Sequence, residues 1–372
     1  MVGGGVIGLA VAWRAAQCGL RVVVLERREP GGGASWVAAG MLAPVTEARL
    51  TELPLLELGV ASAAAYPALV DELLALTDVD PGYQRYGTLA VARDGDEAEA
   101  LEREHELRCR LGLSVTRLRP SEARALEPAL APAVRLALEV PDDHAIDPRR
   151  LTQALLLAAR SAGVEVRVGV AVAEVLCGRG RVSGVRLADG GRLEADNVVI
   201  AAGAWTDELE GIPEEMRIAI HPVKGQLMRL HDPAGPGLTR RVLRLAGAYL
   251  VPREDGRYVL GATMEERGFD TTVTAGAIFE LLRDAVELVP GVSELVVDEL
   301  IAGLRPATAD GLPAIGPGVL AGLHWAVGHF RNGILLAPVT AQIVLAGLEG
   351  QEPPDVARPF LPSRFEAVSV GA

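Results

Sequence analysis

Apolar residues recur at intervals of three and four along seven segments of the chain, which is the period of a helix with one buried face. Asp147 and Pro148 supply a cap and a first-turn proline for the fifth of these helices. Ser35 is expected to cap a further, short helix that begins at Trp36, and we expect the second helix to be interrupted near Pro67. The seven predicted helices cover 9–18, 55–76, 94–111, 121–126, 151–162, 275–288 and 334–348.

Strands are predicted where apolar and polar residues alternate, or where short runs are rich in β-branched residues. Asp189-Gly190 is typical of a hairpin turn between two of them. The predicted strands cover 22–26, 86–92, 164–175, 182–187, 197–200, 221–227, 248–251, 258–263, 296–302 and 325–328.

The order of these elements predicts an α/β protein in which a Rossmann-like domain is interleaved with a mixed-sheet α+β domain. We expect the first domain to be built from 1–80, 141–220 and 303–372, and the second from 81–140 and 221–302. No serine-rich linker separates these segments. A ligand is therefore expected at a tight interface between the two domains.

The glycine-rich stretch near the start of the chain predicts a dinucleotide site. Gly3, Gly5 and Gly8 fit G-x-G-x-x-G, and they permit a tight turn, close approach to a pyrophosphate and close packing of a helix. The helix that follows would point its positive end at the phosphates. Glu26 ends the next predicted strand, where a carboxylate commonly binds a ribose hydroxyl. The alternative is a glycine-rich turn in an ordinary α/β protein.

The strand that should precede this glycine loop is reduced to Met1 and Val2. A buried parallel strand usually has about five or six residues. We therefore expect the native chain to carry further residues before Met1 that complete the strand.

Composition excludes several classes of partner. The formal charge is −13 and Lys224 is the only lysine, so nucleic acid and anionic membranes are not expected to bind. We find no apolar run of the ~20 residues that span a bilayer. The three cysteines are widely spaced, which is typical of a reducing compartment, so we expect a cytoplasmic protein with no metal site.

Two further stretches carry candidate chemistry. The strand–loop–helix at 325–348 would place backbone N–H groups and a helix N-terminus at one point, where they could stabilise negative charge on a ligand; a C-terminal βα unit with a tight turn is the alternative. Arg305 follows a predicted strand and could bind a carboxylate in a bidentate way, or form an interdomain salt bridge. Arg331 has the same two interpretations, and Tyr249 could donate a hydrogen bond or fill the core.

Nine motifs taken together resemble the D-amino-acid-oxidase superfamily, and most closely its branch of glycine oxidases of thiamine biosynthesis. The resemblance covers nearly the whole chain in order. It implies noncovalent FAD, oxidation of glycine, sarcosine or small D-amino acids to the imine, and reduction of O2 to H2O2. The motifs are GGGVIGLAVAW, GASWVAAGMLAP, IDPRRL, AAGAW, HPVKGQ, YLVPR, GATMEE, GLRPATADGLPAIG and GHFRNGILLAP.

The resemblance also assigns roles to residues. Arg305 would bind the substrate carboxylate, with Tyr249 and Arg331 beside it and Met264 in the apolar wall of the site. Gly247 stands where some relatives have a histidine, so the pocket is expected to differ there. The positions expected to bind FAD are Gly3, Gly5, Val6, Ile7, Gly8, Glu26, Arg27, Ala34, Ser35, Ala39, Gly40, Met41, Val172, Ala202, Gly203, His329, Phe330, Arg331, Asn332, Gly333, Ile334 and Leu335.

The resemblance implies hydride transfer from the substrate carbon to the flavin without a protein base, because positioning does most of the work. We expect a small amino acid and O2 as partners, and a homo-oligomer. Two alternatives stay open at this point. One is a related D-amino-acid or sarcosine dehydrogenase that passes electrons to a quinone or carrier protein, and the other is a nucleotide-binding subunit without catalysis.

Overall fold

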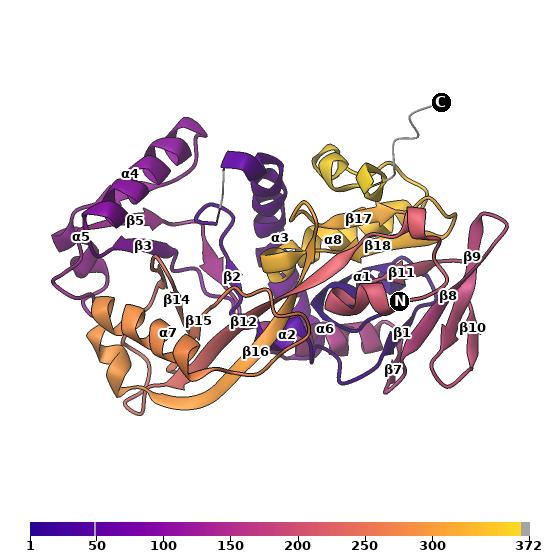
Figure 1. The fold of residues 1–372 in the computed structure, drawn as a ribbon, viewed down its shortest axis with the longest axis horizontal. Coiled ribbons are helices and arrows are strands. Elements are labelled where there is room, and N and C mark those ends of the chain that lie inside the picture. Colours follow the sequence, from indigo (N-terminus) through magenta and orange to yellow (C-terminus); the bar gives the residue numbers. More distant parts are fainter. Residues whose placement is uncertain (48–49, 366–372) are drawn as a thin grey trace.

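The structure is a computed structural model that describes residues 1–47 and 50–365. It contains a parallel sheet covered by helices and an eight-stranded mixed sheet, which lie side by side (Figure 1). The α-helices of the described residues are α1 (Val6–Gln17), α2 (Ala34–Val37), α3 (Leu53–Thr77), α4 (Gly95–Arg110), α5 (Pro120–Leu126), α6 (Pro148–Ser161), α7 (Ala275–Leu288) and α8 (Gly333–Leu348).

The parallel sheet contains β1 (Val23–Glu26), β7 (Glu165–Val168), β11 (Val198–Ile200) and β18 (Leu323–Val327), with β17 (Ala314–Pro317) antiparallel at one edge. Val2 lies between β1 and β11. Its N–H donates to the carbonyl of Val199 at 2.9 Å, and its own carbonyl accepts from the N–H of Ala201 at 2.8 Å. The two N-terminal residues therefore occupy the central position of the sheet, immediately before the glycine loop.

The mixed sheet has the order β16-β12-β15-β14-β13-β3-β5-β4. Its strands are β3 (Thr88–Ala92), β4 (Thr116–Leu118), β5 (Leu136–Val140), β12 (Ile220–His231), β13 (Val242–Arg244), β14 (Tyr249–Pro252), β15 (Arg257–Gly261) and β16 (Val296–Thr308). The long antiparallel pair β12 and β16 extends from this sheet into the core beneath the parallel sheet, where Ile220 packs (Figure 1). This pair connects the two halves of the molecule.

Smaller sheets complete the fold. β8 (Val172–Gly178), β9 (Arg181–Leu187) and β10 (Arg192–Glu194) form an antiparallel sheet, and β2 (Met41–Leu42) pairs with β6 (His144–Ala145). Helices α1, α3, α6 and α8 share one apolar core. The predicted α/β class, with a mixed sheet interleaved in the chain, is confirmed. The predicted domain boundaries stay a prediction, and β16 runs across the one at 303.

Three local predictions were wrong. The short helix begins at Ala34, with Gly33 as its N-cap, because the Ser35 hydroxyl accepts a hydrogen bond from the N–H of Val6 instead of capping its own helix. Helix α3 continues through Pro67. Hydroxyl groups of Ser62 and Tyr66 donate to carbonyl oxygens of α8, which holds α3 in place on the N-terminal side of the proline.

The third error concerns the strand predicted over 164–175, which is two strands, β7 and β8. Gly169 separates them with a φ of 76°, a left-handed conformation that ends the extended chain. Strands β5, β13 and β17 lay outside every predicted element. Each has only three to five residues, too few to show a clear period.

The expectation that no apolar run reaches the length of a bilayer span was also wrong. Helix α3 and the helical segment 330–348 are long and apolar enough by length and composition. Both contribute to the core around α1 and α6. Packing inside the core accounts for their apolar composition.

Candidate functional site

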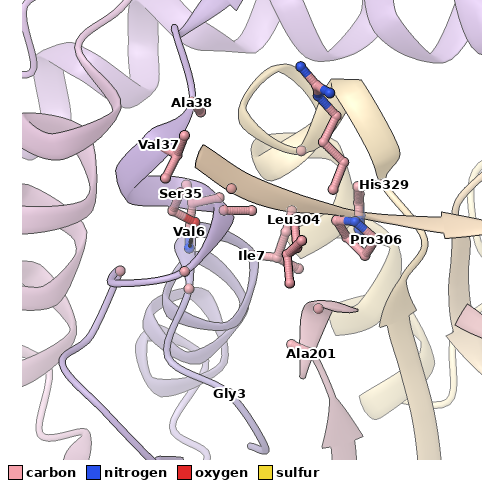
Figure 2. Close-up of a pocket in the computed structure, with 18 of the residues that line it drawn as sticks. Gly3, Val6, Ile7, Ser35, Val37, Ala38, Ala201, Leu304, Pro306 and His329 are labelled. Atoms are coloured by element: carbon pink, nitrogen blue, oxygen red, sulfur yellow. Dashed lines mark hydrogen bonds between the residues drawn. The ribbon is translucent and has the colours of Figure 1, made fainter. Parts of the chain in front are cut away.

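A cavity of about 380 Å³ lies at the carboxyl ends of the parallel strands, between the parallel sheet and the mixed sheet. The glycine loop, α2, the chain after β11, the strand β16 and the start of α8 form its walls (Figure 2). Ligands of open α/β sheets bind in this position, because the loops that follow the strands meet there.

The glycine loop forms one wall, and its geometry depends on two of its glycines. Gly3 has a φ of 102° and its N–H donates to the carbonyl of Leu25 at 2.9 Å. A Cβ on Gly8 would lie 2.1 Å from the carbonyl oxygen of Gly3. Gly8 is therefore required for the packing of α1 on the loop, and it lies behind the cavity wall rather than in it.

The start of α1 faces the cavity without a capping side chain from its own N-cap, Gly5. The Ser35 hydroxyl of α2 accepts from the N–H of Val6 at 3.0 Å, and the two residues lie against each other in Figure 2. A Cβ on Gly5 would meet only this hydroxyl, at 3.3 Å. The open space above Gly5 lets an anionic group approach the helix N-terminus.

Glu26 ends β1 beside this loop. One carboxylate oxygen accepts from the N–H of Gly4 at 2.7 Å, and the other accepts from the N–H of Arg28 at 2.9 Å. Each oxygen keeps a second lone pair for a hydroxyl group of a ligand. The carboxylate is thus held at the cavity wall in a fixed orientation.

Replacing Glu26 with Ala is expected to weaken flavin binding by roughly 10- to 100-fold, because charged hydrogen bonds contribute about 1.5–3 kcal/mol. The measurement is the dissociation constant of FAD by fluorescence. Glu165→Ala on the adjacent strand β7 is the matched control, since Glu165 pairs with Arg167 outside the cavity. Full flavin occupancy in the purified Glu26→Ala variant would exclude the ribose role.

The opposite wall is the turn between β18 and α8. A 3-10 turn over Phe330–Asn332 contains Phe330 at a φ of 46°, and the α8 N-cap Asn332 forms no side-chain cap. His329 is buried and its Nε2 lies 2.9 Å from the hydroxyl of Thr340. Burial lowers the pKa of His329 to about 3. A neutral imidazole and the positive end of a second helix therefore face the cavity here.

Arg305 on β16 has its guanidinium over Gly225 of the neighbouring strand β12. A Cβ on Gly225 would lie 2.4 Å from both terminal nitrogens of the arginine. One of these nitrogens, Nη1, donates to the carbonyl oxygens of Thr263 at 3.0 Å and Lys224 at 3.4 Å. Arg305 forms no ion pair with any residue in 1–47 or 50–365. Its charge is consequently available to an anionic ligand.

Tyr249, at the start of β14, lines the same end of the cavity. Burial raises the pKa of its hydroxyl, and the nearby Arg305 opposes that shift. The phenol is therefore protonated at neutral pH and can donate a hydrogen bond.

Arg331 also lines the cavity, but it is already paired. Its Nη1 lies 3.0 Å from the carboxylate of Glu47, and its Nη2 lies 4.0 Å from that of Glu52. The two arginines predicted for one site thus differ in how far their charge is compensated.

The cavity brings together all but two of the predicted site residues. Gly8 packs behind the wall, and Met264 is 60% exposed and does not line the cavity. The roles of the lining residues stay predictions. Gly225, Glu47 and Trp205 are among the lining residues that were not singled out as site residues from the sequence. Only a pattern of strand pairing could have indicated Gly225, because its importance lies in the register of β12 against β16.

The site has the features that a flavin dinucleotide requires. Two helix N-termini whose own N-cap residues form no side-chain cap face the cavity, one at each side, and a carboxylate lies beside the first. The pyrophosphate would bind at α1, the ribose at Glu26 and the flavin ring near the start of α8. Cys18, Cys109 and Cys177 do not line the cavity, so none of them is placed to attach a flavin there covalently.

Comparisons with known proteins agree with this geometry. The family described as DAO, FAD dependent oxidoreductase, matches residues 1–346. The chain is 37% identical to a glycine oxidase of Geobacillus kaustophilus, over 95% of this chain and 93% of the relative. It is also 37% identical to the bifunctional protein ThiO/ThiG of Synechocystis, over 98% of this chain, and spans about half (53%) of that longer relative.

The same fold is found in a crystal structure of glycine oxidase from Geobacillus kaustophilus. The TM-score is 0.90 at 35% sequence identity, and the match covers 100% of this chain and 98% of the other.

Proposed function

Because the chain belongs to the DAO family of FAD-dependent oxidoreductases, we propose that it oxidises glycine, and small amines such as sarcosine or D-alanine, to the imine. Electrons pass to O2, which is reduced to H2O2. The observation that carries the proposal is Arg305, an uncompensated cation fixed over Gly225 in the cavity that fits the flavin. The match to this family confirms two predictions from the sequence motifs, membership of the family and FAD as the cofactor.

Substrate binding is assigned to Arg305 and Tyr249. The guanidinium takes the substrate carboxylate in a bidentate way, and the protonated phenol donates a further hydrogen bond to it. Glycine offers only a carboxylate and an amine, so an arginine held by two carbonyl oxygens fixes most of its orientation. A substrate fixed in this way has its reacting carbon in one position.

When bound, FAD supplies the acceptor for the hydride that leaves the substrate carbon. The proposal requires no side chain to act as a base. His329, the histidine that lines the cavity, is buried, bonded to Thr340 and has a pKa lowered to about 3. The contribution of the chain is to orient the substrate and to limit its size.

Replacing Gly225 with Ala is expected to raise the KM for glycine about 10- to 100-fold, because the new methyl group would displace the Arg305 guanidinium by about an ångström. The unfolding temperature should change little, since the displaced group is the flexible end of a side chain. Gly276→Ala, at an open position of α7, controls for the substitution itself. An unchanged KM would show that the contact with Gly225 does not position the arginine.

Peroxide formation from glycine in aerated buffer tests whether O2 is the electron acceptor. Stoichiometric H2O2 supports the oxidase. Flavin reduction by glycine without peroxide would instead support the dehydrogenase that passes electrons to a quinone or carrier protein. If no amine reduces the flavin, the remaining alternative is a nucleotide-binding subunit without catalysis.

We further propose that the imine supplies the thiazole of thiamine, because relatives named ThiO/ThiG and glycine oxidase match nearly the whole chain. Cytoplasmic localisation and a homo-oligomeric assembly stay predictions. Size-exclusion chromatography with light scattering measures the second directly.

A further inference from the structure

Among residues 1–47 and 50–365, eight charged side chains line the cavity, and they fall into two groups. Glu26, Arg27, Arg28, Glu29 and Glu208 belong to the glycine-loop side. The other group is Glu47, Arg305 and Arg331, at the end where Tyr249 lies, and the charges of both Glu47 and Arg305 act on the Tyr249 phenol. Glu47 is the one carboxylate in this second group.

Glu47 lies between two arginines. One of its oxygens is 3.0 Å from Nη1 of Arg331, and the other is 3.7 Å from Nε of Arg244. Arg244 also pairs with Glu104 of α4 at 3.1 Å, outside the cavity. The side chains of Glu47 and Arg331 are only 27% and 23% exposed, so solvent screens their charges incompletely.

This arrangement leaves unequal charges at the substrate end. Arg305 pairs with no carboxylate of the described residues. Its guanidinium donates to two carbonyl oxygens and lies beside the neutral Tyr249 phenol, so it presents a full positive charge. The positive charge of Arg331 is compensated by Glu47, with Glu52 at 4.0 Å. The substrate end therefore has one uncompensated cation, Arg305, and one cation that is paired with a carboxylate, Arg331.

We propose that Glu47 is a specificity-determining residue that restricts the site to monocarboxylates. It neutralises Arg331, which would otherwise bind a second carboxylate, and it repels that carboxylate directly. The proposal rests on the proposed function, because it assigns to Arg305 the first carboxylate of the substrate. It adds to the proposed function a class of substrate that the site rejects, namely amines that carry two carboxylates.

The test uses two small anions that cannot be oxidised, acetate and malonate. Their dissociation constants for the FAD-loaded protein are measured from the perturbation of the flavin spectrum at constant ionic strength. The unsubstituted protein is expected to bind acetate more tightly than malonate. In Glu47→Gln the ratio of the two constants should shift toward malonate by about tenfold.

Two variants show whether the effect belongs to this contact. Glu104→Gln removes the same charge from the same chain of ion pairs but outside the cavity, and should leave the ratio unchanged. In the double variant Glu47→Gln/Arg331→Gln, the gain in malonate affinity should disappear, because Arg331 is the cation that loses its nearer carboxylate when Glu47 is replaced.

The proposal is overturned if the unsubstituted protein binds malonate as tightly as acetate, a result that needs no variant. It is also overturned if Glu47→Gln shifts the ratio by less than about threefold, if Glu104→Gln shifts it equally, or if the double variant keeps the gain. None of these measurements requires turnover. Failure of glycine to reduce the flavin, with normal acetate binding, would remove the proposed function and leave this result standing.

Discussion

Replacing Arg305 with Ala is expected to raise the KM for glycine by roughly 30-fold or more, because a charged hydrogen bond to a desolvated carboxylate contributes roughly 2–5 kcal/mol. No described carboxylate pairs with the guanidinium, and Arg331, the other arginine at this end of the cavity, is paired with Glu47, so no free cation there replaces Arg305. Steady-state kinetics with glycine as the varied substrate measures the change.

Arg305→Lys separates charge from geometry. Lysine keeps the charge but cannot bind a carboxylate with two parallel hydrogen bonds, so it should recover only part of the lost affinity. Arg358→Ala, an exposed arginine near the end of the described chain, controls for loss of charge. An unchanged KM in Arg305→Ala would remove the carboxylate role from this residue.

The second large effect is expected at Gly8. An alanine there would place its methyl group 2.1 Å from the backbone oxygen of Gly3, and neither backbone can move without displacing α1 from the glycine loop. Overpacking of a rigid contact costs about 1–3 kcal/mol or more. The apo-protein should therefore unfold several degrees lower, and FAD should be lost on purification.

Gly5→Ala provides the matched contrast. Its methyl group would meet only the Ser35 hydroxyl, at 3.3 Å, so the apo-protein should keep its unfolding temperature. FAD binding should still fall, because the methyl group occupies the space through which the pyrophosphate approaches the helix. Equal stability losses in the two variants would contradict the distinct roles assigned to these glycines.

The sequence predicted those elements whose local signals agree with their surroundings. Helix α6 starts at the Asp147 cap and Pro148, and the Asp147 carboxylate accepts from the N–H of Arg149 as expected. The glycine loop, α1 and Glu26 lie where the motif places them. In these cases residues within one short stretch determine the local structure.

Predictions failed where a distant contact decides the local structure. Ser35 has the chemistry of a cap, but its hydroxyl is used by Val6, 29 residues away. A proline such as Pro67 usually interrupts a helix. Here Ser62 and Tyr66, in the turn before the proline, donate hydrogen bonds to carbonyl oxygens of α8 and hold α3 in place. The apolar run 53–77 meets the criterion for a membrane span, yet it belongs to a core that only the fold assembles.

The candidate site shows the same division. The residue pattern singled out Arg305 and Tyr249, and family resemblance added their roles and most of the FAD wall. The structure gathers nearly all of these residues around one cavity. The importance of Gly225 depends on the register of β12 against β16, and that of Glu47 on its ion pair with Arg331 in the turn before α8. No local sequence pattern indicates either contact. Met264 could be placed in the wall only by analogy, and it is exposed instead.

A small amine is expected to reduce the flavin directly in this cavity. Anaerobic mixing of the purified FAD-loaded protein with glycine, sarcosine and D-alanine, followed by flavin absorbance, tests it most directly. Glycine is expected to bleach the oxidised flavin band, and in Arg305→Ala the band should bleach only at much higher glycine concentration. A flavin that stays oxidised with all three amines would show that the protein is not an amine oxidoreductase of this kind.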